Sequence, residues 1–167
     1  MKIVLANDHA AYELKSYLKP WLSERGYEIE DLGTDSSDSV DYPDFAHRLA
    51  ETVAQSNGDA LGILMCGSGN GVCMTANKHK GIRAALAWNP EIAALARQHN
   101  NANVLCLPAR FITDMEAREI VSAWLGAQFE GGRHFKATPF ECSRNGQLSV
   151  SASHANIYPN DYVRPAP

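Results

Sequence analysis

The chain has 167 residues, and 45% of them are hydrophobic, which is enough for one sizeable core and argues for a single domain. Its net charge of −4 gives no basic footprint for nucleic acid. No apolar run approaches the roughly 20 residues of a membrane helix, and the first apolar run is too short for a signal peptide. We therefore expect a cytoplasmic protein whose partners include neither nucleic acid nor membrane.

Apolar runs and helical spacings alternate along the first 125 residues. Short apolar runs predict strands at residues 2–6, 27–32, 60–65, 81–87 and 103–107. Apolar residues at helical spacing predict helices at residues 10–25, 43–56, 90–99 and 113–125, and one more between a glycine-rich turn and residue 78. Five β-α repeats indicate an α/β fold of three layers, in which helices cover both faces of a parallel, Rossmann-like sheet.

The regular alternation ends near residue 126. Thr138-Pro-Phe-Glu141 is a capping box and predicts a short helix to about residue 146. We therefore place a single domain at residues 1–146. Residues 147–167 are rich in Ser, Asn and Pro and form a tail that is either disordered or packed on a partner subunit.

The most informative stretch is Cys66-Gly-Ser-Gly-Asn-Gly71, between a predicted interior strand and a helix. Its three glycines permit positive φ and close approach of the backbone to a ligand. Several N–H groups should converge there, which favours an anion, and a thiol at the mouth is a usable base or nucleophile. The spacing fits neither a dinucleotide fingerprint nor a P-loop, and Val72 stands where a cysteine phosphatase loop needs arginine.

Polar residues follow three of the predicted strands. Asp8 and His9 follow the first strand, the cysteine–glycine turn follows the third, and Arg110 follows the fifth. In an open parallel sheet, ligands bind beyond the carboxyl ends of the strands. If the first and third strands are neighbours, Asp8, His9 and Cys66 share one crevice.

A set of motifs over residues 1 to 135 resembles the ribose-5-phosphate isomerase B and galactose-6-phosphate isomerase family. The motifs are Asn7-Asp8-His9-Ala10, Asp41-Tyr42-Pro43, Cys66 to Gly71, Ala76-Asn77-Lys78, Gly81-Ile-Arg83, Ala96-Arg97-Gln-His99-Asn100 and Gly131-Gly-Arg-His134. The resemblance implies five parallel strands whose order starts 2-1-3, with the last two exchanged. It also implies a homodimer or dimer of dimers with shared active sites, and isomerisation of sugar phosphates without metal or other cofactor.

The resemblance assigns the chemistry to three side chains. Cys66 would be the base that moves a proton between C1 and C2, and His99 would open the furanose ring as general acid. The enediolate oxygens would be held by Ser68 and by the turn, namely the N–H groups of Gly67, Gly69, Asn70 and Gly71. Some family members carry a glutamate base at the position of Val72. In this sequence that position is apolar and a thiol is present at Cys66, which favours Cys66 as the base.

The resemblance also assigns residues to the sugar and its phosphate. Asp8 and Tyr42 would hold hydroxyls during ring opening, and Asn100 would hold a sugar oxygen. The phosphate would be gripped by His9, Arg110 and Arg133. Family members commonly carry another basic residue just after Gly-Gly-Arg-His, and here Lys136 is the nearest candidate.

Several other functions are compatible with these residues. Ribose 5-phosphate is the first choice of substrate, and allose, galactose or tetrose phosphates are alternatives. A phosphosugar-binding module without activity is a second class, and a Cys-His hydrolase is a third. The four cysteines form no C-x-x-C pair, so we expect neither a disulfide framework nor structural zinc.

Overall fold

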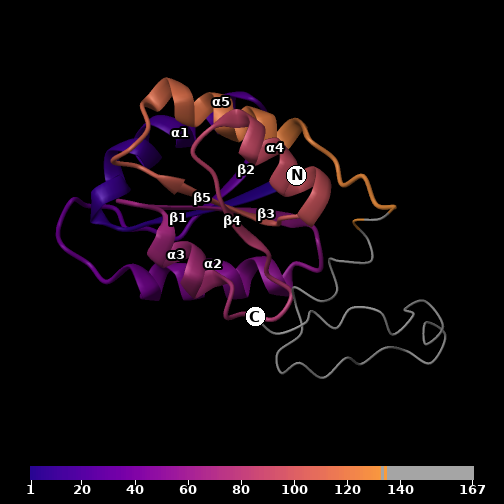
Figure 1. The fold of residues 1–167 in the computed structure, drawn as a ribbon. Coiled ribbons are helices and arrows are strands. Elements are labelled where there is room, and N and C mark those ends of the chain that lie inside the picture. The colour runs from indigo at the N-terminus through magenta and orange to yellow at the C-terminus, as the bar shows by residue number, and fades with distance from the viewer. Residues whose placement is uncertain (133, 135–167) are drawn as a thin grey trace, which may run out of the picture.

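The computed structural model describes residues 1–132 and 134 (Figure 1). The strands are β1 (Lys2–Asn7), β2 (Glu28–Asp31), β3 (Ala60–Cys66), β4 (Ala84–Leu86) and β5 (Val104–Pro108). The helices are η1 (His9–Ala11), α1 (Tyr12–Glu24), α2 (Tyr42–Gln55), α3 (Asn70–Ala76), α4 (Pro90–Asn100) and α5 (Asp114–Gly126). No helix of this described part is both long enough and apolar enough to cross a bilayer.

The five strands form one parallel sheet in the order β2-β1-β3-β5-β4. The predicted start 2-1-3 and the exchange of the last two strands are both confirmed. β1 and β3 are neighbours, with Leu5 opposite Ile63. All carboxyl ends therefore meet at one edge of the sheet, which we call the carboxyl edge, and all amino ends meet at the opposite edge, the amino edge.

Helices cover both faces of the sheet, as predicted. Figure 1 shows α1, α4 and α5 on one face and α2 and α3 on the other. Successive strand residues alternate between the two cores because side chains along a strand point to opposite faces. Ile3 and Leu5 pack in the first core, and Val4, Ala6 and Cys66 pack in the second. The side chain of Cys66 therefore belongs to the face covered by α2 and α3.

The predicted elements near β4 are shorter in the structure. The strand expected at residues 81–87 is only Ala84–Leu86, and the helix expected to reach residue 78 ends at Ala76. Asn77 explains both differences, because its side chain donates to the Ala84 carbonyl at 2.8 Å and accepts from the Ala84 N–H at 2.9 Å. The amide side chain pairs with the first residue of β4 in place of a neighbouring strand.

The helix starts follow their capping residues. Thr113 and Glu116 form a capping box at the start of α5, with bonds in both directions. Asn89 caps α4 by accepting from the Ile92 N–H at 2.9 Å. The expected helix starting at residue 10 is preceded by the short η1, which Asp8 caps. The capping box at 138–141, the domain boundary at 146 and the tail lie outside the described residues.

Candidate active site

Cys66 is the last residue of β3, at the carboxyl edge. Its residue surface is 5% exposed, and its sulfur accepts a hydrogen bond from the Gly69 N–H at 3.1 Å. Gly69 has a φ of +74°, and a Cβ at this position would lie 2.4 Å from Leu86 Cδ1. Glycine is therefore required here both by backbone conformation and by space. This constraint brings the Gly69 N–H onto the sulfur.

The glycine turn is held from the other side by the loop after β5. Ala109 donates to the Cys66 carbonyl at 2.9 Å, and Arg110 donates to the Gly67 carbonyl at 3.0 Å. The side chain of Arg110 passes over Gly67, where an added Cβ would meet its Cδ at 3.4 Å. The loop thus brings an exposed guanidinium beside the turn, as an anion site at this edge requires.

Two exposed polar residues complete the turn. Ser68 and Asn70 are exposed, and the Ser68 hydroxyl accepts a long hydrogen bond of 3.4 Å from the Asn70 N–H. Val72, by contrast, is fully buried in the core. Val72 therefore offers no base in this turn, and the thiol of Cys66 is the candidate base that the turn contains. α3 has seven residues, so the converging N–H groups of the turn matter more than the dipole of so short a helix.

Asp8 and His9 lie next to this turn, at the end of β1. Asp8 is 8% exposed, its N–H donates to the Met65 carbonyl at 3.1 Å, and its Oδ1 accepts from the Ala10 N–H at 2.9 Å. His9 is half-buried and its Nδ1 accepts from the Val40 N–H at 3.3 Å. That bond leaves the proton on Nε2, which is the atom available to a ligand.

Tyr42 covers the far side of the turn. It is the first residue of α2, it is 38% exposed, and a Cβ added to Gly71 would lie 2.7 Å from its ring. The carboxyl edge thus collects the predicted residues from β1, β3, the β5 loop and α2, namely Asp8, His9, Tyr42, Cys66, Gly67, Ser68, Gly69, Asn70, Gly71 and Arg110.

His99 and Asn100 lie elsewhere, at the carboxyl end of α4. This helix leads back to β5, so it ends at the amino edge, where the Asn103 carbonyl accepts from the Gly62 N–H at 2.9 Å. From Gly62 to Cys66, four residue steps of roughly 3.3 Å separate the two edges by about 13 Å. Within one chain, His99 and Cys66 cannot contact the same small sugar carbon.

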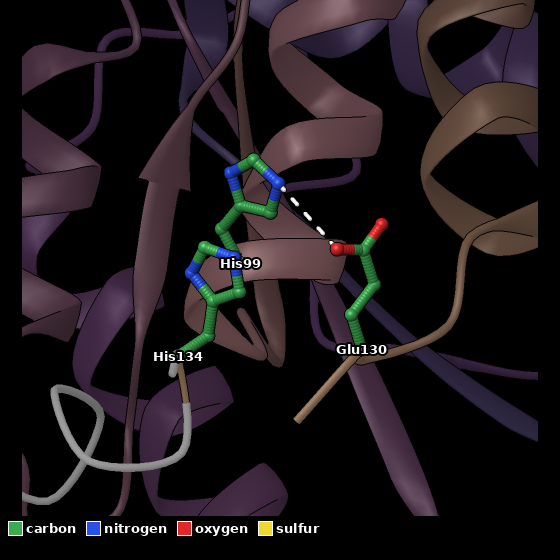
Figure 2. Close-up of side chains that lie close together, drawn as sticks. All are labelled: His99, Glu130 and His134. Atoms are coloured by element: carbon green, nitrogen blue, oxygen red, sulfur yellow. Dashed lines mark ion pairs between the residues drawn. The ribbon is translucent and has the colours of Figure 1, made fainter. Parts of the chain in front are cut away.

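His99 has partners that the sequence did not predict. Figure 2 shows its ring stacked on that of His134, with centroids 4.1 Å apart and planes 3° from parallel. Its Nε2 lies 3.8 Å from Glu130 Oε2, and the Glu130 N–H donates to the Gln98 carbonyl. Glu130 and His134 follow α5, and their packing on α4 depends on the path of the chain after that helix. No local sequence signal predicts this path.

These three residues invite comparison with a metal site, since one ligand atom from each lies within 4.8 Å of the others. Coordination by two imidazoles requires in-plane lone pairs that converge on one point. The lone pairs of His99 and His134 lie in nearly parallel planes, because the rings are 3° apart. The arrangement is that of two stacked rings beside a carboxylate rather than that of a coordination sphere.

A cavity of about 330 Å³ opens at the amino edge beside Asn100. Its polar lining comes from Asn77, Arg83 and Asn100. Burial, and then the charge of Arg83, lower the pKa of the nearby Arg97 guanidinium.

Two further residues predicted to bind the phosphate, Arg133 and Lys136, lie outside the described residues.

Comparison with known proteins gives one family. Residues 3–138 match the family model described as Ribose/Galactose Isomerase. The chain belongs to this ribose/galactose isomerase family. It is also 53% identical over 135 residues to a probable ribose-5-phosphate isomerase B of Mycoplasma pneumoniae, covering 80% of this chain and 88% of that relative.

Two further relatives bear on the substrate. The structure of ribose-5-phosphate isomerase B from Mycoplasma genitalium with bound ribulose-5-phosphate superposes with a TM-score of 0.81 at 47% identity, over 86% of this chain and 97% of that one. A D-erythrulose-4-phosphate isomerase of Pectobacterium atrosepticum is 41% identical over 133 residues, which is 79% of this chain and 87% of that relative. The family therefore contains proteins named for more than one sugar phosphate.

Proposed function

We propose that this protein interconverts ribose 5-phosphate and ribulose 5-phosphate without a cofactor. The observation that carries the proposal is the sulfur of Cys66, which lies almost buried at the carboxyl edge and accepts the Gly69 N–H at 3.1 Å within the glycine-rich turn. Its support is the chain's membership of the isomerase family, together with the bound ribulose-5-phosphate in the Mycoplasma genitalium relative.

The proposed step is a proton transfer between neighbouring carbons. The Cys66 thiolate takes the proton from C2 of the open-chain aldose, and the electrons of that C–H bond form the enediolate. The resulting thiol returns the proton to C1, and the hydroxyl proton on O2 moves to O1. C2 then carries the carbonyl and C1 the hydroxyl, which gives the ketose. Charge develops on the oxygens during this step, and the turn's N–H groups with the Ser68 hydroxyl are suited to stabilise it.

The phosphate end of the substrate is proposed to lie at the same edge. His9 with Nε2 protonated is a hydrogen-bond donor, and Arg110 is a permanent cation beside Gly67. Arg133 and Lys136 are the further phosphate ligands that we propose. Binding a group remote from the reacting carbons orients them against the sulfur.

Ring opening is proposed to use His99 of a second copy of the chain. The two edges of the sheet are about 13 Å apart, so one chain cannot apply both His99 and Cys66 to the same carbon. A twofold dimer that joins the carboxyl edge of one copy to the amino edge of the other supplies both groups. Asp8 and Tyr42 would then hold the ring hydroxyls, and Asn100 of the second copy would hold a sugar oxygen.

A substrate panel tests the proposal. We expect the highest kcat/KM with ribose 5-phosphate among aldose phosphates of four, five and six carbons, with solvent deuterium entering the product. A tetrose phosphate is the second candidate, because one relative is named for erythrulose 4-phosphate. If no member of the panel is converted to a ketose, the protein is a phosphosugar-binding module without this activity. A covalent acyl-thiol intermediate seen by intact mass would instead indicate a hydrolase.

A further inference from the structure

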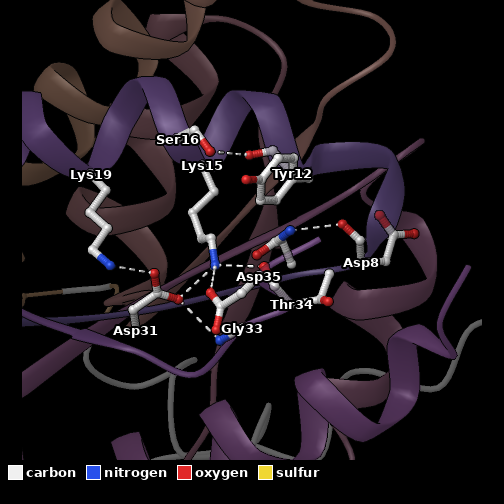
Figure 3. A network of polar contacts seen from close by, with 10 residues as sticks. Asp8, Tyr12, Lys15, Ser16, Lys19, Asp31, Gly33, Thr34 and Asp35 are labelled. Atoms are coloured by element: carbon white, nitrogen blue, oxygen red, sulfur yellow. Dashed lines mark hydrogen bonds and ion pairs between the residues drawn. The ribbon is translucent and has the colours of Figure 1, made fainter. Parts of the chain in front are cut away.

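Lys15 of α1 is a buried cation far from the reacting sulfur in the sequence. Its side chain is only 3% exposed. Its Nζ donates to Asp31 Oδ1 at 2.8 Å, to the Thr34 carbonyl at 2.7 Å and to Asp35 Oδ1 at 3.0 Å, as Figure 3 shows. Lysine is almost never fully buried unless it is paired, and here three acceptors match the three N–H groups.

The surrounding charges balance within a small cluster. Lys19 donates to the other oxygen of Asp31 at 2.8 Å from a side chain that is 47% exposed. Burial alone would raise the pKa of Asp31, but hydrogen bonds from Lys15, Lys19 and the Gly33 N–H outweigh it and hold that pKa below its ordinary value. Two cations therefore face two carboxylates, those of Asp31 and Asp35.

The segment that Lys15 holds is joined directly to β1. The Asn7 N–H donates to the Gly33 carbonyl at 2.8 Å, and the Thr34 N–H donates to the Asn7 carbonyl at 3.0 Å. Asn7 is followed at once by Asp8 and His9 of the candidate site. The contacts of Lys15 thus fix the backbone where the loop of residues 34–41 departs from the sheet.

The other end of this loop reaches the site. The Val40 N–H donates to Nδ1 of His9, and Tyr42, which follows the loop, packs its ring over Gly71. These are the side chains proposed to hold the phosphate and a sugar hydroxyl. A shift at the Lys15 end of the loop is therefore transmitted to both of them.

We propose that Lys15 is a positioning residue, which fixes the start of the 34–41 loop so that its far end presents His9 and Tyr42 to the sugar phosphate. This inference rests on the proposed function. The nearest matched control is Lys19, because it pairs with the same Asp31 carboxylate but makes none of the contacts to Thr34 and Asp35.

The first test compares Lys15→Met with Lys19→Met in ribose 5-phosphate turnover. A misplacement of about 1 Å costs up to ~10²-fold, so we expect Lys15→Met to raise KM at least tenfold while kcat changes by less than about threefold. Lys19→Met should leave both near wild type. A purely structural role would lower the active fraction, and hence the apparent kcat, with KM unchanged; that result would overturn the proposal.

A second variant separates positioning from charge balance. Lys15→Met with Asp31→Asn keeps the cluster neutral, so it should recover much of the thermal stability that Lys15→Met loses. The bond to the Thr34 carbonyl is still missing, so KM should stay raised. Recovery of KM together with stability would show that only charge balance matters, and would refute the positioning role.

Hydrogen exchange over residues 32–42 gives a readout that needs no activity. We expect faster exchange in Lys15→Met and wild-type exchange in Lys19→Met, since only the first loses the anchor at Thr34. Unchanged exchange in Lys15→Met would contradict the inference. Absence of turnover in the wild type would instead refute the proposed function, and the exchange data would still decide whether Lys15 fixes the loop.

Discussion

The sulfur of Cys66 is distinguished from the other described thiols by what surrounds it. Cys106 is fully buried, and burial, with the neighbouring Cys73, raises the pKa of its thiol well above the ordinary value. Cys73 is half-buried, and a contact with Cys106 lowers its pKa, but its sulfur donates to the Ala84 carbonyl at 3.3 Å. Of the three, Cys66 is the one that accepts an N–H in the glycine turn.

Replacing the sulfur therefore gives a prediction at the scale of one residue. Cys66→Ala should lower kcat by about 10²–10⁴-fold, because it removes the proposed general base. Binding of ribose 5-phosphate, measured by calorimetry, should change little, since the phosphate ligands remain.

Cys73→Ser is the matched control, because it alters a thiol and keeps a donor for Ala84. It should keep nearly full activity. Near wild-type turnover in Cys66→Ala, or an equal loss in Cys73→Ser, would show that the base is another group.

At the scale of an element, the β3–α3 turn depends on the glycine at position 69. Gly69 and Gly81 both have positive φ, +74° and +85°, so alanine costs roughly 1–2 kcal/mol of backbone strain at either position. Only at Gly69 would the new Cβ also collide, 2.4 Å from Leu86 and 3.2 Å from the backbone of Leu107. Gly69→Ala should thus lose about 1–3 kcal/mol more unfolding free energy than Gly81→Ala.

Chemical denaturation measures that difference. Gly81 has no heavy atom within 4 Å of its added Cβ, so its variant reports the conformational cost alone. Equal losses in the two variants would mean that the turn relaxes around the new methyl group, and that the bond from the Gly69 N–H to the sulfur does not depend on tight packing.

The contact between α1 and the end of β2 predicts how stability responds to acid. The folded state lowers the pKa of Asp31, so its contribution is complete above the unfolded value of about 4 and is lost as the pH falls through the folded value. Between about pH 6 and about pH 3, wild type should lose more unfolding free energy than Asp31→Asn. Equal losses in urea titrations would contradict this assignment.

Elements with a local signal could be predicted from the sequence, and those that depend on tertiary approach could not. The apolar period predicted α4 and α5, and the caps at Asn89 and Thr113 that begin them are local too, because a cap acts within one turn. The pairing of Asn77 with Ala84 spans seven residues, and the bond of Lys15 to Asp31 spans sixteen; both depend on how the chain folds back between them. The composition around Asn77 or Lys15 therefore did not predict these contacts.

The same division applies to the candidate site. Asp8 and Cys66 could be placed together because they lie at the carboxyl ends of neighbouring parallel strands. The contact of His99 with Glu130 could not be predicted, since it depends on where the chain runs after α5. The position of His99 at the opposite edge of the sheet, by contrast, follows from the predicted β-α alternation, because a helix that leads to a parallel strand ends at the edge where that strand begins.

At the scale of the whole molecule, the separated edges require a second chain for the proposed reaction. Trp88 is 55% exposed and Phe111 is 74% exposed, and apolar surface of this kind is typical of an interface between subunits. We expect at least a dimer by light scattering at catalytic concentrations. A monomer with full activity would contradict the shared site.

Mixing two inactive variants tests the central claim most directly. Cys66→Ala and His99→Asn should each be nearly inactive alone, because each lacks one group at every site. After subunit exchange in an equimolar mixture, half of the dimers are hybrids with one intact site of two, so about a quarter of wild-type activity should return. A mixture that stays as inactive as its components would contradict an active site built from Cys66 of one chain and His99 of another.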